Sequence, residues 1–223
     1  MNLIENEAVE SKKSSLFFKI RVAVYSIFVL LMIFYGAYNV IYSKEVSIRE
    51  LCRKDDRDAC FYLRMQRYCN FGEMIGCYSL GHLYSGGNVV DKDLNRALAY
   101  FNKACDGGYA ISCDHLGMIY KNGNKTAQDS AVALAYFKKA CEGNDAAGCD
   151  NAGVAYYTGD GVEKNYEEAI KYFEKACSGS DSKGCFNLGV MHRRGKGTEQ
   201  NPEKAEKYFQ TSCRLGYKPG CEI

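Results

Sequence analysis

The 223-residue chain has no tryptophan, two prolines and three histidines, and it carries little net charge. The scarcity of proline, together with plentiful alanine, tyrosine and lysine, favours helices over strands. With 29 basic and 27 acidic residues the formal net charge is +2, which gives no electrostatic case for a nucleic-acid partner. Three histidines are also a poor supply for a hydrolytic metal site, and we expect neither a metal nor a cofactor.

What the chain has in excess is cysteine, with 12 residues. Consecutive cysteines are paired 8 positions apart, and from Cys69 onward each pair recurs after 36 residues. Such a fixed period indicates a solenoid built from one repeated supersecondary unit. The six pairs are Cys52/Cys60, Cys69/Cys77, Cys105/Cys113, Cys141/Cys149, Cys177/Cys185 and Cys213/Cys221.

Glycines and aromatic residues keep the same period. Each repeat predicts two helices, for example residues 165–177 and 185–194, with apolar stripes at helical spacing. A glycine inside a helix costs about 1 kcal/mol relative to alanine, so we expect a neighbouring helix to approach these glycines too closely for a larger side chain. The recurring tyrosine–phenylalanine pairs are predicted to lie in the core. These positions are Gly81, Gly117, Gly153 and Gly189, and Tyr100–Phe101, Tyr136–Phe137, Tyr172–Phe173 and Tyr208–Phe209.

The cysteine pairs fall where one helix ends and the next begins. Cys177 is expected in the last turn of one helix and Cys185 in the first turn of the next, and an antiparallel hairpin brings these turns within reach of a disulfide. A zinc site would need closer cysteine pairs or nearby histidines, and the redox motif C-x-x-C is absent. We therefore predict six structural disulfides, one for each pair, and no cysteine nucleophile.

The motif A-x-x-Y-F-x-K-A-C, followed after seven residues by C-x-x-L-G-x-x-Y-x-x-G, is specific. It occurs as Ala133 to Cys141 and then Cys149 to Gly159, with Ala152 in place of leucine. This pattern resembles the Sel1-like repeat family, a relative of tetratricopeptide repeats, and its disulfide-rich branch, the Helicobacter cysteine-rich proteins. The resemblance covers residues 50–223. It implies an all-α, right-handed α/α superhelix with one disulfide per hairpin, exported from the cytoplasm, and it carries an attribution of weak β-lactamase or penicillin-binding activity to some members.

The N-terminal region predicts a membrane anchor. Residues 22–42 contain no charge, and 21 helical residues span about 30 Å, the thickness of a bilayer core. Basic residues precede the segment, so residues 1–21 are expected in the cytoplasm and residues 43–223 in the periplasm, as a single-pass bacterial inner-membrane protein. The alternative is secretion after signal cleavage, but the stretch is long for a signal peptide and no A-x-A-like site follows. Disulfides agree with export.

The two ends of the repeat region depart from the pattern. Residues 50–68 are too few for a whole repeat and predict an atypical cap before the 36-residue repeats of 69–223. Cys221 is followed only by Glu222 and Ile223, so the last hairpin is expected to lack its second helix and to be uncapped or covered by a partner.

Catalytic motifs are weak. A serine β-lactamase needs S-x-x-K supported by S-D-N and K-T-G. One S-x-x-K occurs, Ser180 to Lys183, about as often as chance predicts, and the supporting motifs are absent. We expect no catalytic residue, and a β-lactamase-like hydrolase stays an alternative on the family resemblance alone.

A binding scaffold has more support, because stacked hairpins form a concave surface lined by the first helix of each repeat. Polar residues recur there and could hold a peptide backbone or carboxylate. The expected partner is a protein, a peptide or a cell-wall fragment related to peptidoglycan. The competing interpretation is that these are solvated positions of amphipathic helices. The candidate ligand-binding residues are Ser79, His115, Asn151, Asn187, Asn122, Thr158 and Arg194.

The pairing is testable by non-reducing mass mapping of the purified protein. We expect links within each hairpin, such as Cys105–Cys113, because only neighbouring helix ends bring the sulfur atoms together. Links between hairpins, such as Cys113–Cys141, would contradict the hairpin arrangement.

Overall fold

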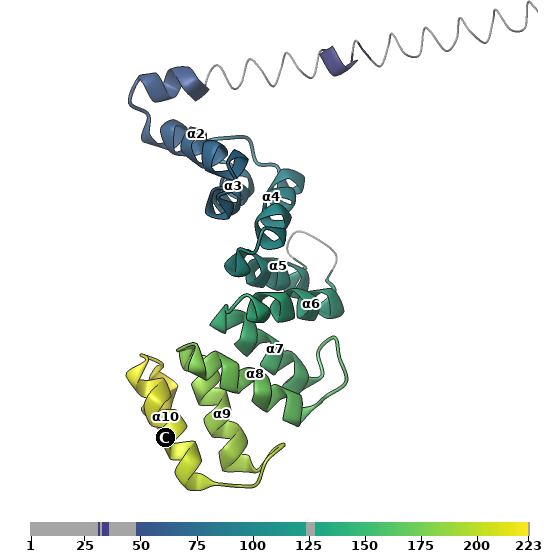
Figure 1. The fold of residues 1–223 in the computed structure, drawn as a ribbon, viewed down its shortest axis with the longest axis vertical. Coiled ribbons are helices and arrows are strands. Elements are labelled where there is room, and N and C mark those ends of the chain that lie inside the picture. The colour runs from purple at the N-terminus through teal and green to yellow at the C-terminus, as the bar shows by residue number, and fades with distance from the viewer. Residues whose placement is uncertain (1–30, 32, 36–47, 124–127, 223) are drawn as a thin grey trace, which may run out of the picture. The chain divides into compact units, whose positions relative to one another are not determined.

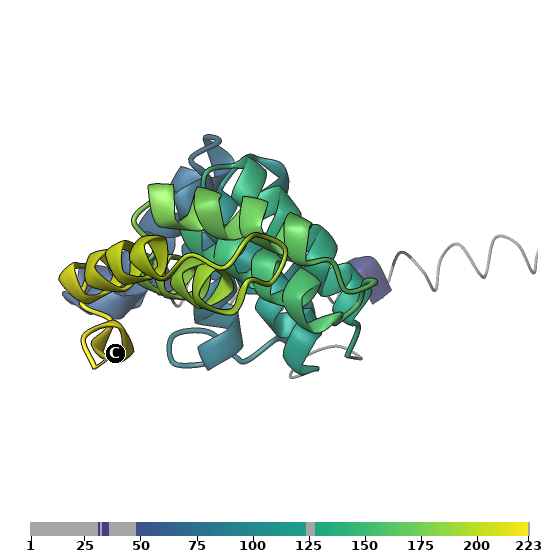
Figure 2. The ribbon, with the colours of Figure 1, turned by 90° about the horizontal axis from the view of Figure 1, so that it is seen from below.

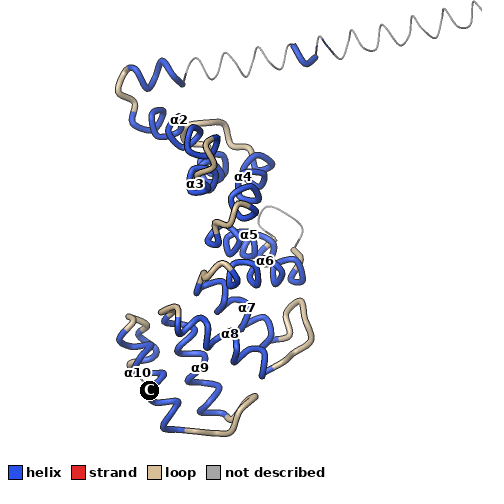
Figure 3. Tube along the Cα trace, in the orientation of Figure 1, coloured by secondary structure: helices blue, strands red, loops and turns tan. Residues whose placement is uncertain are grey.

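The computed structural model describes residues 31, 33–35, 48–123 and 128–222, and all secondary structure in these ranges is helical (Figure 3). The predicted all-α class is therefore confirmed. The predicted cytoplasmic tail and nearly all of the anchor, residues 22–42, lie outside the described residues. In the described ranges, none of the helices has both the length and the apolar character that crossing a bilayer requires.

The chain divides into two compact units, Met1–Cys60 and Phe61–Ile223. In the first, residues 48–53 are helical and Cys52 is bonded to Cys60. In the second, each helix from α3 to α10 lies beside the next, which makes a solenoid (Figures 1 and 2). The elements are α2 (Arg57–Asn70), α3 (Met74–Gly86), α4 (Leu94–Asp106), α5 (Ala110–Asn122), α6 (Ser130–Glu142), α7 (Ala146–Thr158), α8 (Tyr166–Ser178), α9 (Ser182–Arg194), α10 (Pro202–Arg214) and the 3₁₀ turn η1 (Lys218–Gly220). We name α3, α5, α7 and α9 the first helices, and α4, α6, α8 and α10 the second helices.

Local sequence sets where these helices begin and end. Each second helix starts after an aspartate or asparagine whose side chain accepts a hydrogen bond from the backbone N–H three residues on, which satisfies a donor that the helix leaves unpaired. Each first helix ends at a glycine in the left-handed conformation, as expected for Gly195, whose φ is 63°. The capping residues are Asp93, Asp129, Asn165 and Asn201, and the glycines are Gly87, Gly123, Gly159 and Gly195.

One predicted boundary was wrong. The helix expected to begin at Cys185 begins at Ser182, so the connection from α8 is shorter than the inter-cysteine segment. The reason is a cap: Asp181 Oδ1 accepts a hydrogen bond of 2.6 Å from the Gly184 N–H and starts the helix early.

The core of each repeat is a phenylalanine ring packed on a glycine. Phe173 of α8 is buried, and a Cβ added to Gly153 of α7 would lie 2.6 Å from its Cδ1 atom. The same added atom on Gly189 would lie 2.6 Å from the Phe209 ring, which confirms the close approach predicted at that glycine. Phe101 on Gly81 and Phe137 on Gly117 repeat the contact.

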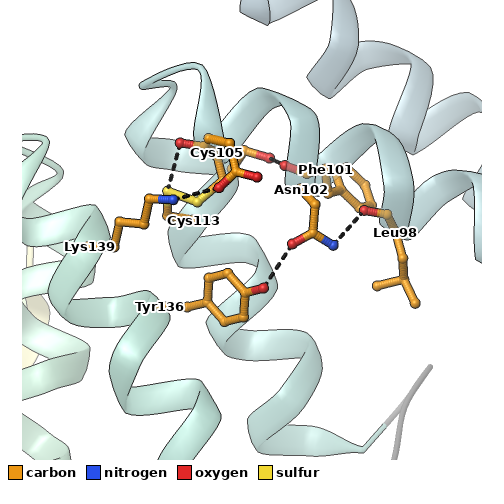
Figure 4. Close-up of a disulfide and its surroundings, with 9 residues drawn as sticks. Leu98, Phe101, Asn102, Cys105, Cys113, Tyr136 and Lys139 are labelled. Carbon is orange, nitrogen blue, oxygen red and sulfur yellow. Dashed lines mark hydrogen bonds and ion pairs between the residues drawn. A yellow bond between two sulfur atoms is a disulfide. The ribbon is translucent and has the colours of Figure 1, made fainter.

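The tyrosine of each pair is not a core residue, contrary to prediction. It is half-buried and stacks on an aromatic ring of the preceding first helix, for example Tyr156 on Tyr172 with centroids 5.5 Å apart. Its hydroxyl reaches outward, and that of Tyr136 donates a 2.8 Å hydrogen bond to Asn102 Oδ1 on α4 (Figure 4). The tyrosine thus connects second helices of adjacent repeats. The other stacks are Tyr84–Tyr100, Tyr120–Tyr136 and His192–Tyr208.

All 12 cysteines are paired in the structure, each with its neighbour 8 positions away. Figure 4 shows the bond between Cys105 near the end of α4 and Cys113 in the first turns of α5. The bond joins a second helix to the first helix that follows it. A closed loop of this length stabilises a hairpin by about 2.5 kcal/mol in the chain-entropy estimate.

The contact between glycine and phenylalanine predicts a specific sensitivity to a methyl group. Replacing Gly153 with alanine is expected to lower the free energy of unfolding by about 1–3 kcal/mol, because the buried Phe173 ring has no room to move away. Urea unfolding of the oxidised protein measures this change.

Gly86→Ala is the matched control. Gly86 is also the last residue of a first helix, but a Cβ there meets nothing within 4 Å. We expect this variant to be as stable as the wild type or up to about 1 kcal/mol more stable. Equal effects of the two substitutions would contradict the packing argument.

Candidate functional site

The predicted ligand-binding residues lie on the first helices, and the structure gives them different roles. Ser79 and Thr158 bond to their own helix: each hydroxyl donates to the carbonyl four residues back, Ile75 and Val154, at 2.8 Å. Such bonds satisfy the hydroxyl locally, so these two residues are weak candidates. Asn122 is exposed at the end of α5.

Asn151 and Asn187 form a regular polar arrangement. Asn151 Nδ2 donates a 2.7 Å hydrogen bond to Asp114 Oδ1, and Asn187 Nδ2 donates a 2.8 Å hydrogen bond to Asp150 Oδ1. Each bond joins neighbouring first helices, α5 to α7 and α7 to α9. We name these four residues the Asp–Asn ladder. The sequence showed the asparagines but not their partners, because the equivalent positions in the outer repeats are Tyr78 and Phe186.

The aspartates of the ladder are electrostatically unusual. Asp150 is only 6% exposed, and this burial raises the pKa of its carboxyl to about 6, although the hydrogen bond from Asn187 acts in the opposite direction. Burial likewise raises the pKa of Asp114, against the hydrogen bond from Asn151. A carboxylate removed from water costs stability, and such groups are concentrated at functional sites. The ladder is therefore the strongest candidate site on the first helices.

An aromatic cluster adjoins the ladder at the N-terminal end. His115 of α5 lies 4.9 Å from His82 and 6.0 Å from Tyr78, between ring centroids, and both rings belong to α3. The sequence placed the two histidines in separate repeats, and no motif signals that 33 residues of separation bring them together. A cleft of about 230 Å³ opens beside His82. Its lining residues are Phe61, Tyr78, Ser79, His82, Leu83, Gly86 and Asn88.

The S-x-x-K motif is not enclosed. Ser180 is exposed at the turn after α8 with φ of 65°, and Lys183 is exposed in the first turn of α9. Solvent at both side chains leaves the lysine hydrated, which does not suit activation of a serine nucleophile. Within the described ranges, no group of three histidine, cysteine or acidic side chains could hold a metal ion.

The buried carboxyl of Asp150 predicts a pH-dependent stability. Its pKa is higher in the folded protein than the ordinary value of 3.8, so folding favours the protonated form, and the stabilisation present below about pH 4 is lost as the pH rises through 6. Asp150→Asn keeps an acceptor for Asn187 and removes the charge. We expect it to raise the unfolding free energy by roughly 2 kcal/mol at pH 7.5 and to have little effect below pH 4.

Chemical unfolding across this pH range tests the sign. Asp106→Asn serves as the control, because the Asp106 side chain is 71% exposed and its removal should change stability by less than about 0.5 kcal/mol at any pH. An Asp150→Asn variant less stable than the wild type at pH 7.5 would contradict the account.

Comparison with known proteins places this geometry. The Sel1 repeat family matches four consecutive stretches, residues 75–109, 110–145, 146–181 and 182–217, well over half of the chain. No curated protein sequence matches. Each match begins in or just before a first helix and includes the following second helix. Each of the four disulfides from Cys69–Cys77 to Cys177–Cys185 after the first therefore crosses a boundary between repeats.

Solved structures with similar folds include an antigen, a Sel1 repeat protein and a cysteine-rich protein. The protective antigen c5321 of uropathogenic Escherichia coli, with an SLR fold, is 28% identical with a TM-score of 0.67 over 72% of this chain, which spans only 34% of the antigen. The Sel1 repeat protein of Oxalobacter formigenes is 24% identical, with a TM-score of 0.61 over 71% of each chain.

Helicobacter pylori cysteine-rich protein B is 36% identical, with a TM-score of 0.49, over 61% of this chain and 98% of its own. The four matched repeats confirm the relationship that the residues predicted. The chain belongs to the Sel1 repeat family.

Proposed function

We propose that this Sel1 repeat scaffold binds an extended segment of a protein or peptide on the face formed by its first helices. The observation that carries the proposal is the Asp–Asn ladder, which holds two buried aspartates at a cost in stability. An asparagine amide has two N–H donors and an acceptor oxygen. The ladder uses one N–H of Asn151 and one of Asn187, which leaves each amide a donor and an acceptor for a peptide backbone.

The ladder also fixes the orientation of these amides. Because Asp114 and Asp150 each hold the asparagine of the next repeat, the side chains do not have to be ordered when a ligand arrives. Ordering a polar side chain on binding costs about 0.5–1.5 kcal/mol, so a prearranged pair of amides favours affinity. Repetition after 36 residues presents the amides at regular intervals, as a bound extended chain requires.

The proposed location is the periplasmic side of a bacterial inner membrane. Six disulfides suit an oxidising compartment outside the cytoplasm. The uncharged residues 22–42 support a single-pass anchor, and a secreted form after cleavage is the alternative. In that compartment both protein segments and peptidoglycan-related peptides carry the amide groups that the ladder would bind.

Photo-crosslinking in intact cells tests the proposed face. A benzoylphenylalanine at position 118, in place of Met118, lies one helical turn from Asp114 and is 37% exposed. The same group in place of Lys171, whose side chain is 64% exposed on α8, is the control. We expect a discrete adduct from position 118 and none from position 171. Equal labelling from both positions would contradict the proposal.

Side-chain variants refine the test. In the position-118 protein, Asn151→Ala with Asn187→Ala should reduce the adduct about tenfold or more, because at least two hydrogen bonds of about 1 kcal/mol each are lost. Ser79→Ala occupies the equivalent repeat position but removes only a bond within α3, so it should have no effect. Circular dichroism melts establish that each variant is folded. An undiminished adduct in the folded double variant would remove the ladder from the binding face.

A further inference from the structure

Four polar side chains converge at the C-terminal ends of the last two first helices. Tyr157 is near the end of α7, Tyr166 begins α8, Arg194 ends α9, and Lys196 follows in the next loop. Lys196 Nζ lies 3.4 Å from the Tyr157 hydroxyl oxygen and 3.5 Å from that of Tyr166. It also lies 5.1 Å and 5.0 Å from the two ring centroids, which are 5.5 Å from one another.

The cations of this cluster are held without a carboxylate. Among the side chains that the structure describes, neither Arg194 nor Lys196 takes part in an ion pair. Partial burial raises the pKa of Tyr157, but Lys196 and Arg194 both act on its hydroxyl and together lower it. Two positive groups therefore act on one phenol oxygen, and the local field favours a negative charge.

The repeat fold does not require this cluster. One repeat earlier the equivalent residues have other chemistry: they are Lys121, Ser130, Thr158 and Asp160. Basic residues at the end of α9 also suit the helix dipole, which explains a positive charge at Arg194. The dipole does not explain the two tyrosine hydroxyls directed at Lys196, because this lysine lies beyond the helix.

We infer that Tyr157, Tyr166, Arg194 and Lys196 form a binding site for a carboxylate group. A planar guanidinium matches the two oxygens of a carboxylate, while the ammonium and the phenol O–H groups supply further donors. The inference rests on the proposed function, since Arg194 lies on the first helices that carry the ladder. The carboxylate would belong to the bound segment, either at its C-terminus or on an aspartate or glutamate side chain.

Small probes test the site on the full-length chain by two-dimensional amide NMR, with Gly195 and Gly197 as reporters in the loop that carries Lys196. The probes are acetyl-Ala-Ala with a free C-terminus, its C-terminal amide, and acetyl-Glu with an amidated C-terminus. We expect saturable shifts with either carboxylate and none with the neutral amide. The tighter of the two carboxylates identifies the source. Equal shifts from the neutral amide, or from inorganic phosphate, would overturn a carboxylate site.

Variants connect the shifts to the named residues. Arg194→Gln with Lys196→Gln should weaken carboxylate binding at least tenfold. Lys175→Gln is the matched control, because Lys175 Nζ also lies over a tyrosine ring, 5.7 Å from the Tyr172 centroid, away from the cluster. Unchanged binding in the double variant would overturn the assignment.

Crosslinking from position 118 separates this inference from the function it rests on. An adduct that persists in a chain showing no carboxylate binding rejects the carboxylate site and leaves the binding face intact. Carboxylate binding lost in the double variant, together with a weakened adduct, supports both.

Discussion

The packing of a phenylalanine ring on a glycine determines how close the two helices of each repeat lie. A ring from the second helix fills the space where the glycine of the first helix has no Cβ, and the contact recurs in all four repeats. Because the ring is buried and the glycine cannot be enlarged, the helices keep one separation and one rotation. Every other recurring contact, from the stacked tyrosines to the ladder, depends on that constant geometry.

The disulfides act at a different place. The phenylalanine–glycine contact closes each Sel1 repeat internally, whereas Cys105–Cys113 and its equivalents tie the second helix of one repeat to the first helix of the next. Small contact areas between neighbours are the weak points of a solenoid, and a covalent bond at each boundary strengthens them. The neighbouring first helices then stay in register, so that Asp114 and Asp150 keep their asparagine partners despite burial.

The sequence predicted what is periodic or local. Cysteine spacing, capping glycines such as Gly195 and the close approach at Gly189 follow from composition at fixed intervals. It did not predict contacts between neighbouring first helices, because their offset of 33 or 37 residues differs from the 36-residue period and depends on how the helices pack. For the same reason His82 and His115 were taken as separate residues, and the partners of Asn151 and Asn187 were missed.

Hydrogen exchange of a chain without one boundary disulfide tests the central claim most directly. Replacing Cys141 and Cys149 with serine removes the bond between α6 and α7 and leaves the phenylalanine–glycine contacts in place. If the disulfides hold the repeats in one array, amides of α6 and α7 should exchange roughly 50-fold faster, the equivalent of about 2.5 kcal/mol. Exchange in these two helices that matches the oxidised wild type would show that packing alone maintains the array.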